Sequence, residues 1–173
     1  MTPVKARATV KRGARGARVA IVRARWNEDI TLALERAALE RATANGAAVD
    51  VFEVAGSFEL PAAVALLADT ATYDAIVPLG CLIRGETPHF EVLANAVARG
   101  ILDLSLTYPV AIPFGVLTCD TVEQALARAG GAEGNKGSEF MDAALEMVAL
   151  RQAVASKSRS SRPRPKAKSR STR

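Results

Sequence analysis

The sequence predicts an α/β fold, in which a parallel β-sheet is flanked by helices. Short β-type runs alternate with helical runs along the chain, as expected where each pair of parallel strands is joined by a crossover helix. The 173 residues, 49% of them hydrophobic, are enough for one domain with a proper core and too few for two ordinary domains.

The first predicted strand covers residues 18–22, where four apolar residues follow one another. A helix follows over residues 28–44, with Asn27 as its cap and Asn45-Gly46 at its end. An apolar run at residues 49–54 predicts the second strand.

A Gly-Ser-Phe-Glu segment at residues 56–59 leads into a helix that ends at about residue 70, and the third strand covers residues 75–82. Pro78 lies inside this strand, and the sequence offers only a β-bulge to explain it. Pro113 lies inside a fourth strand at residues 110–117, and it predicts a sheet edge because proline cannot donate to the ladder.

A long helix is predicted to begin at Pro88, and two further helices cover residues 122–128 and 135–154. The apolar positions of the long helix recur at helical spacing, so one of its faces should pack inward. These positions are Phe90, Leu93, Ala94, Val97, Ile101 and Leu104.

Charge is segregated along the chain. Residues 1–18 contain six basic and no acidic side chains, and residues 151–173 contain nine and none. The segment between them has eight basic and 18 acidic residues, so the body is acidic although the whole chain carries +5. We expect a basic extension at 1–17, a catalytic domain at 18–154 and a disordered basic tail at 155–173.

The basic tail predicts weak, nonspecific binding to polyanions such as RNA. A solvated tail without a partner remains an alternative, because no aromatic residues are interleaved with its cations. We expect no membrane span and no signal peptide, and therefore a cytoplasmic protein. Two cysteines and one histidine fit no disulfide framework and no metal-ligand spacing, so reduced thiols and no metal are expected.

His89, the only histidine, lies where the third strand ends and the long helix begins. We predict Thr87 as the cap of this helix and Pro88 in its first turn. Backbone N–H groups at a helix start suit an anion such as phosphate, and a neighbouring imidazole can accept a proton near pH 7. A histidine that only packs or caps is the alternative.

Aromatic residues lie near the ends of three of the four predicted strands: Trp26, Phe58 and Phe114. Because ligands of open parallel sheets bind beyond the carboxyl ends of the strands, these rings predict a flat heterocyclic ligand. Glu59 could accept hydrogen bonds from its ring N–H groups, although it could also serve only as a helix-capping charge. Core packing is the alternative for each ring.

The segment 128–137 combines Arg128 and Lys136 with four glycines just before a helix, which could form an anion site. A plain loop is the alternative, and the glycine spacing does not match a nucleotide P-loop.

Taken in order, several segments resemble the successive motifs of the 6,7-dimethyl-8-ribityllumazine synthase family. They are Trp26-Asn27, the segments 56–61, 80–91 and 114–118, the residues 124–125 with 128–130, and Asn135-Lys136-Gly137. The resemblance covers about residues 18–150, and neither tail belongs to it. It implies a three-layer α/β/α sandwich of the flavodoxin-like type with a four-stranded parallel sheet in the order 2-1-3-4.

The resemblance also implies a reaction without a cofactor. 5-Amino-6-(D-ribitylamino)uracil condenses with 3,4-dihydroxy-2-butanone 4-phosphate to give the lumazine, phosphate and water, the penultimate step of riboflavin biosynthesis. His89 would transfer protons. The ribitylaminouracil would be held by Trp26, Ser57, Phe58, Glu59, Cys81, Leu82, Ile83 and Phe114, and the butanone phosphate by Glu86, Thr87, Arg128 and Lys136.

In this family the site lies between adjacent subunits of a pentamer, or of an assembly of pentamers. Phe114, Arg128 and Lys136 would therefore come from the neighbouring subunit, and an N-terminal strand could extend the neighbour's sheet. Two other functions stay open at this point: a riboflavin synthase that shares the fold, and a scaffold whose basic tails gather RNA or acidic partners.

Overall fold

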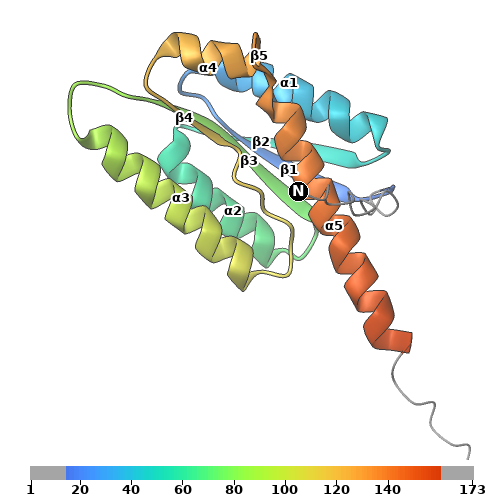
Figure 1. Ribbon diagram of the computed structural model, residues 1–173. Coiled ribbons are helices and arrows are strands. Elements are labelled where there is room, and N and C mark those ends of the chain that lie inside the picture. Colours follow the sequence, from blue (N-terminus) through green and yellow to red (C-terminus); the bar gives the residue numbers. More distant parts are fainter. Residues whose placement is uncertain (1–14, 161–173) are drawn as a thin grey trace, which may run out of the picture.

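The computed structural model describes residues 15–160, which form a parallel sheet of four strands in the order β2-β1-β3-β4 (Figure 1). The strands are β1 (Arg18–Ala24), β2 (Ala48–Val54), β3 (Ala75–Ile83) and β4 (Val116–Cys119). All three neighbouring pairs run parallel. The predicted flavodoxin-like arrangement and its strand order are confirmed.

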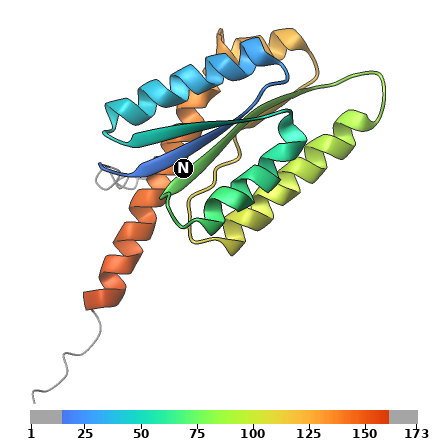
Figure 2. The ribbon, with the colours of Figure 1, turned by 180° about the vertical axis from the view of Figure 1, so that it is seen from behind.

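Helices cover both faces of the sheet and make the fold three-layered (Figure 1). One face carries α1 (Glu28–Ala44), α4 (Val122–Arg128) and α5 (Lys136–Ser160). The other face carries α2 (Leu60–Asp69) and α3 (His89–Thr107), which lie side by side when the molecule is seen from behind (Figure 2).

The core lies on both faces of β3, the strand between β1 and β4. Leu79 and Cys81 pack among the side chains of α1 and α5, whereas Ile76 and Leu82 pack among those of α2 and α3. Successive side chains of a strand point to opposite faces, so a strand covered on both sides needs an unbroken apolar sequence. This explains why β3 is almost entirely apolar.

The fourth strand is shorter than the sequence predicts. The prediction covers residues 110–117, but β4 begins at Val116, and before it only Ala111 forms an isolated bridge, with Ala75. As predicted, β4 is an edge strand, but Pro113 lies in the chain that leads to it.

Two prolines account for the interruption. Two residues before Pro78, the Ile76 N–H donates to the Ala111 carbonyl at 2.9 Å. Two residues after it, the Gly80 N–H donates to the Gly115 carbonyl at 3.2 Å. By the same spacing an N–H at residue 78 would face the Pro113 carbonyl, but neither proline has an N–H group to donate to the ladder. The pairing of β3 with β1 continues through Pro78 without a shift. The predicted bulge is therefore wrong, because a gap in the neighbouring ladder accommodates the proline.

One predicted helix cap is wrong, and another is confirmed in position only. Pro88 occupies the cap position of α3 and His89 is its first residue, so Thr87 lies too early to cap the helix. A residue before proline is disfavoured in helical conformation, which delays the helix start. Asn27 does occupy the cap position of α1, but its left-handed backbone, with φ of 58°, is not accompanied by a side-chain capping bond.

Some local structure is not predicted from the sequence. A short 3-10 helix, η1 (Ser57–Glu59), precedes α2, and the strands β5 (Ala129–Gly131) and β6 (Gly134–Asn135) form a small antiparallel hairpin before α5. α5 also continues to Ser160, six residues past the predicted end at residue 154, so the first part of the expected tail is helical.

Most of the two basic extensions lies outside the described residues, namely residues 1–14 and 161–173. Across residues 15–160, no helix combines the length and apolar character needed to cross a membrane.

Candidate active site

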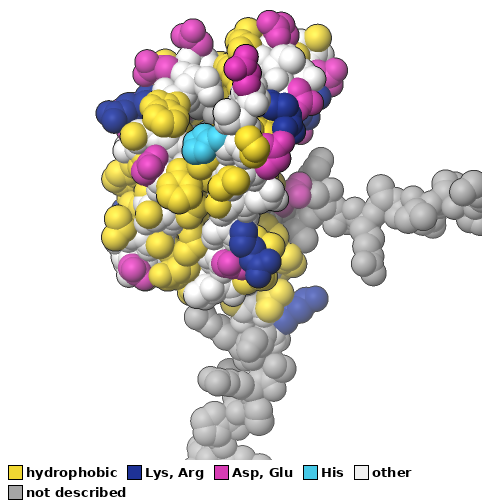
Figure 3. Space-filling view, turned by 90° about the vertical axis from the view of Figure 1, so that its left-hand side faces the viewer, with side chains coloured by type: hydrophobic (Ala, Val, Ile, Leu, Met, Phe, Trp, Pro, Cys, Tyr) yellow, Lys and Arg dark blue, Asp and Glu magenta, His cyan; other side chains and the backbone are white. Residues whose placement is uncertain are grey.

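Most of the side chains predicted to form the site lie at or beyond the carboxyl ends of β1, β2 and β3. Figure 3 views the molecule from the side where β3 ends, and the single histidine lies there between hydrophobic side chains with charged groups around them. His89 is exposed as the first residue of α3, and no side chain within residues 15–160 forms a hydrogen bond with its imidazole. The imidazole is therefore accessible to a ligand.

None of the three predicted aromatic rings is part of the core. Trp26 and Phe58 follow the ends of β1 and β2, but Phe114 lies before β4 begins, so the expectation that it lies at the carboxyl end of the fourth strand is wrong. The exposed fractions are 65% for Trp26, 59% for Phe58 and 41% for Phe114. Core packing, the alternative for each ring, is thereby excluded in the single chain. Exposed rings of this size suit stacking on a flat ligand or contact with another subunit.

The turn from β2 to α2 is built against Trp26. The Trp26 N–H donates to the carbonyl of Ala55 at 3.1 Å, and a Cβ added to Gly56 would lie 3.2 Å from the Trp26 ring. One oxygen of Glu59 accepts the Gly56 N–H at 2.9 Å. Glu59 therefore does have the capping role that the sequence offered as an alternative, while its second oxygen remains available at the exposed surface.

Ser57 provides a buried polar atom that lacks a partner. Its side chain is 3% exposed, and its Oγ has no hydrogen-bond partner among the described residues. Gly80 on β3 leaves room for this hydroxyl, because a Cβ at that position would lie 2.6 Å from the Ser57 Oγ. Since a buried hydroxyl without a partner is costly, this atom is suited to a hydrogen bond with a ligand or a water molecule.

The end of β3 offers backbone rather than side chains. Leu82 packs into the core on one face, and Cys81 packs into it on the other. Burial, together with the charge of Cys119, raises the pKa of the Cys81 thiol to about 12, so Cys81 is a neutral thiol and not a nucleophile near neutral pH. The Cys81 carbonyl accepts a hydrogen bond of 2.9 Å from the Asn27 side chain, a contact that the sequence analysis missed.

Arg128 and Lys136 differ in how their charges are engaged. Arg128, at the end of α4, donates to the backbone carbonyl of Gln124 at 3.0 Å, and no carboxylate within residues 15–160 pairs with it. Lys136, at the start of α5, lies 2.7 Å from the nearer carboxylate oxygen of Glu139. Of the two cations among the predicted phosphate ligands, Arg128 thus has the more available charge.

The Asn-Lys-Gly segment also has a structural role. Asn135 donates to the carbonyl of Ala33 on α1 at 3.0 Å and accepts the Gly137 N–H at 2.9 Å. A Cβ on Gly137 would lie 2.0 Å from the carbonyl oxygen of Leu34, so only glycine permits this contact between α1 and α5. The segment fixes the start of α5, and with it the position of Lys136.

A single chain does not bring all the predicted residues together. Residues 81–83 end β3, and Trp26 and the segments 57–59 and 86–89 follow the ends of β1, β2 and β3 at the same end of the sheet. Arg128 and Lys136 instead belong to α4 and α5, which cover the face of the sheet opposite to α3.

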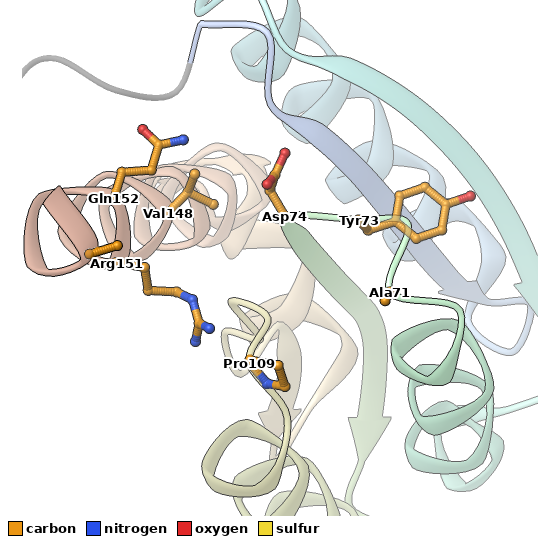
Figure 4. A pocket seen from close by; sticks show the side chains of 8 residues that line it. Ala71, Tyr73, Asp74, Pro109, Val148, Arg151 and Gln152 are labelled. Carbon is orange, nitrogen blue, oxygen red and sulfur yellow. The ribbon is translucent and has the colours of Figure 1, made fainter. Parts of the chain in front are cut away.

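A cavity of about 360 Å³ lies at the other end of β3, away from His89 (Figure 4). Tyr73, Asp74, Pro109 and Arg151 are among the side chains that line it. Asp74 accepts the Arg18 N–H and Tyr73 donates to Asp50, each at 2.9 Å, so two of its polar groups already have partners. The cavity contains none of the predicted site residues. Within residues 15–160, no group of three or more His, Cys, Asp or Glu side chains is arranged to hold a metal ion.

Comparison with known proteins gives one family. A sequence profile described as 6,7-dimethyl-8-ribityllumazine synthase matches residues 16–152. A protein of that name from Gemmatimonas aurantiaca is 44% identical over 138 residues, covering 78% of this chain and 84% of the relative. A relative of the same name from Methylobacterium radiotolerans is 46% identical, over 79% of this chain and 84% of the relative. Another from an Anaeromyxobacter species is 45% identical, over 82% of this chain and 89% of the relative.

Proposed function

Because this chain belongs to the 6,7-dimethyl-8-ribityllumazine synthase family, we propose how its residues divide the work of that enzyme. The enzyme is a transferase that condenses 5-amino-6-(D-ribitylamino)uracil with 3,4-dihydroxy-2-butanone 4-phosphate. The products are 6,7-dimethyl-8-ribityllumazine, phosphate and water, and the reaction is the penultimate step of riboflavin biosynthesis.

The ribitylaminouracil binds at the ends of β1, β2 and β3. Trp26 and Phe58, with Phe114 from a second subunit, stack on its ring, and their exposure in the single chain supports this role. The free oxygen of Glu59 and the buried hydroxyl of Ser57 form hydrogen bonds with its polar atoms. Cys81, Leu82 and Ile83 contribute backbone groups, because the side chains of the first two are buried in the core.

The phosphate of the second substrate binds where α3 begins. The backbone N–H groups of Glu86 and Thr87, the Thr87 hydroxyl and the Arg128 guanidinium hold it, with Lys136 nearby. The Glu86 carboxylate would repel a phosphate, so its N–H group is the part that binds. Arg128 suits this role because its only side-chain hydrogen bond within residues 15–160 goes to a backbone carbonyl.

His89 moves the protons of the condensation. The 5-amino group attacks the ketone carbon and water leaves, which forms an imine. His89 then removes the proton from the carbon that bears the hydroxyl, and the phosphate ester bond at the next carbon breaks. The resulting enol becomes a ketone, the ribitylamino nitrogen attacks it, and a second water leaves as the ring closes. Orientation and proton transfer are the main demands of these steps.

The complete site lies between two subunits of a pentamer. Phe114, Arg128 and Lys136 come from the neighbour of the subunit that provides His89. This is supported by the single chain, where Arg128 and Lys136 lie on elements that cover the face opposite to α3. A monomer should therefore be nearly inactive. The exposed outer edge of β2 leaves room for residues from the N-terminal extension of a neighbour.

The enzyme works in the cytoplasm, and its C-terminal tail binds polyanions weakly. Residues 161–173 contain six basic and no acidic side chains, which predicts binding that is independent of sequence and falls steeply with salt. A chain that ends at Ser160 keeps all of α5 and should lose this binding to RNA but not the condensation. Unchanged RNA binding by the shortened chain would contradict the role of the tail.

The function is tested by mixing the purified chain with both substrates and following the fluorescence of the lumazine. We expect lumazine and phosphate to form in equal amounts. Offering the lumazine alone tests the rival riboflavin synthase activity, and riboflavin formation in that reaction would contradict the assignment, as would the absence of lumazine in the first.

A further inference from the structure

Arg84 is the first residue after β3 and starts the loop that leads to His89. Its backbone N–H donates to the carbonyl of Cys119 at 2.9 Å, which continues the pairing of β3 with β4 by one more bond. Its side chain is 43% exposed and turns back over the loop rather than into the core. No role in the reaction has been assigned to it so far.

The guanidinium of Arg84 joins three elements. Its Nε lies 2.7 Å from Asp120 in the loop between β4 and α4, and its Nη1 donates to Glu91 in the first turn of α3. Its Cζ lies 4.4 Å from the centre of the Phe90 ring, within cation–π distance. The hydrogen bond from Arg84 lowers the pKa of Glu91, so Glu91 is a carboxylate at neutral pH. One side chain thus clamps the start of α3 to the end of β4.

This pairing argues against Arg84 as a ligand of the substrate phosphate. Two carboxylates share one guanidinium, so the cluster of Arg84, Glu91 and Asp120 carries a net negative charge. A phosphate that approached it would meet this charge. Arg128, which pairs with no carboxylate within the described part of the chain, is the better ligand.

We propose that Arg84 is a positioning residue that holds residues 85–88 in the shape that binds the substrate phosphate. The loop carries Glu86 and Thr87 and ends where His89 begins α3. Its two ends are fixed by the contacts of Arg84 to Glu91 and Asp120, so the N–H groups between them are oriented before the substrate arrives. This inference rests on the proposed phosphate site.

The clamp continues into α4. The Asp120 N–H donates to the side chain of Gln124 at 2.9 Å, and Thr121 caps α4 by accepting the Gln124 N–H at 3.3 Å. Asp120 is thus held at a fixed place relative to α4, and a rigid carboxylate orients Arg84 better than a mobile one. The ion pair between Arg84 and Asp120 therefore depends on the fixed position of Asp120 as well as on charge.

The test compares Arg84→Met and Asp120→Asn with the unaltered enzyme. If the loop adopts its binding shape for only a tenth of the time without the clamp, the apparent affinity falls by about tenfold. We therefore expect the KM for the butanone phosphate to rise about tenfold in both variants, and inorganic phosphate to inhibit more weakly by a similar factor. The KM for the pyrimidine substrate should stay within about twofold, and kcat within about threefold, because saturating substrate restores the loop.

The sign of the Asp120→Asn effect separates positioning from direct binding. If Arg84 bound the phosphate itself, removing a competing carboxylate would free its charge and lower the KM for the butanone phosphate. A lower KM in Asp120→Asn, or an unchanged KM in Arg84→Met, would overturn the proposal. The double variant should be no worse than Arg84→Met, because both changes break the same clamp.

Two further variants complete the design. Arg84→Lys keeps the charge but cannot span both carboxylates in the same way, so its KM should lie between those of the unaltered enzyme and Arg84→Met. Arg41→Met removes a partly exposed arginine that pairs with Asp142 at 2.5 Å far from the loop, and it should leave both KM values unchanged. Failure of the unaltered enzyme to form lumazine would instead contradict the proposed function.

Discussion

At the scale of single residues, the ion-pair and hydrogen-bond partners of an arginine show whether it has a structural role or is available to bind a ligand. Arg23 and Arg84 each contact more than one carboxylate, whereas Arg128 donates only to a backbone carbonyl. A guanidinium that already has carboxylate partners gains less from a phosphate than one without them. The sequence alone shows three arginines of equal charge, and only the contacts rank them.

Replacing His89 with alanine should slow turnover and leave binding largely intact. Loss of a proton-transfer group typically lowers kcat by a factor of about 10² to 10⁴, and we expect a decrease of about 10² because the substrates supply part of the reactivity. Steady-state kinetics with both substrates gives kcat and the two KM values. Full activity of His89→Ala would contradict its role.

Arg128→Ala should have the opposite signature. A charge-assisted hydrogen bond to phosphate is worth about 1.5–3 kcal/mol, so the KM for the butanone phosphate should rise by about 10- to 100-fold. The KM for the pyrimidine substrate should change little. Arg36→Ala, at an exposed position on α1, is the matched control and should behave like the unaltered enzyme.

The buried thiol of Cys81 makes stability depend on pH in the alkaline range. Its pKa is about 12 in the folded chain and ordinarily 9, so between these values the unfolded chain loses a proton that the folded chain keeps. The free energy of unfolding should therefore be unaffected by this group below pH 9 and fall as the pH rises above it. Urea unfolding at about pH 8 and about pH 10 measures the decrease, which should be smaller in Cys81→Val.

At the scale of secondary-structure elements, one buried arginine joins β1, β2 and α1. Arg23 is 2% exposed, and its Nε lies 2.8 Å from a carboxylate oxygen of Glu35 on α1, an ion pair without the alignment of a hydrogen bond. Its Nη2 donates to Glu53 on β2.

Arg23→Met should lower the free energy of unfolding by about 3 kcal/mol, because Glu35 would keep a largely buried charge without its partner. Adding Glu35→Leu should recover part of this loss, and urea unfolding of the two variants measures both effects. Equal stability of Arg23→Met and the unaltered chain would show that Glu35 is better solvated than its surroundings indicate.

The periodic elements could be predicted from the sequence, whereas the junctions between them could not. The bounds of α1 agree with the prediction, since its start and its end at Asn45 carry local signals. The short β4 depends on where Pro78 and Pro113 fall in the β3–β4 register, and that register pairs residues far apart in sequence. For the same reason the sequence indicated Arg84 as part of a motif but could not reveal its partners.

At the scale of the whole molecule, the proposed division of the site between subunits can be tested by mixing variants. His89→Ala and Arg128→Ala each damage a different side of the shared site. If the two chains assemble together at random, about a quarter of the sites receive both intact residues. Both variants should have low activity when the butanone phosphate is well below the KM of Arg128→Ala, and under that condition unfolding and refolding them together should restore activity to about a quarter of the normal value. Continued inactivity of a mixed assembly would place both residues in the same subunit's site.

Because the β3–β4 ladder has a gap beside Phe114, the position of this ring can change without disrupting the sheet. The backbone around this ring is anchored at Ala111 on one side and at Gly115 on the other, and the chain between the anchors adds no further bond to the ladder. Lengthening or shortening that short span would move the ring while the strands keep their register. Evolution or design can thus tune the aromatic wall of the site independently of the scaffold that supports it.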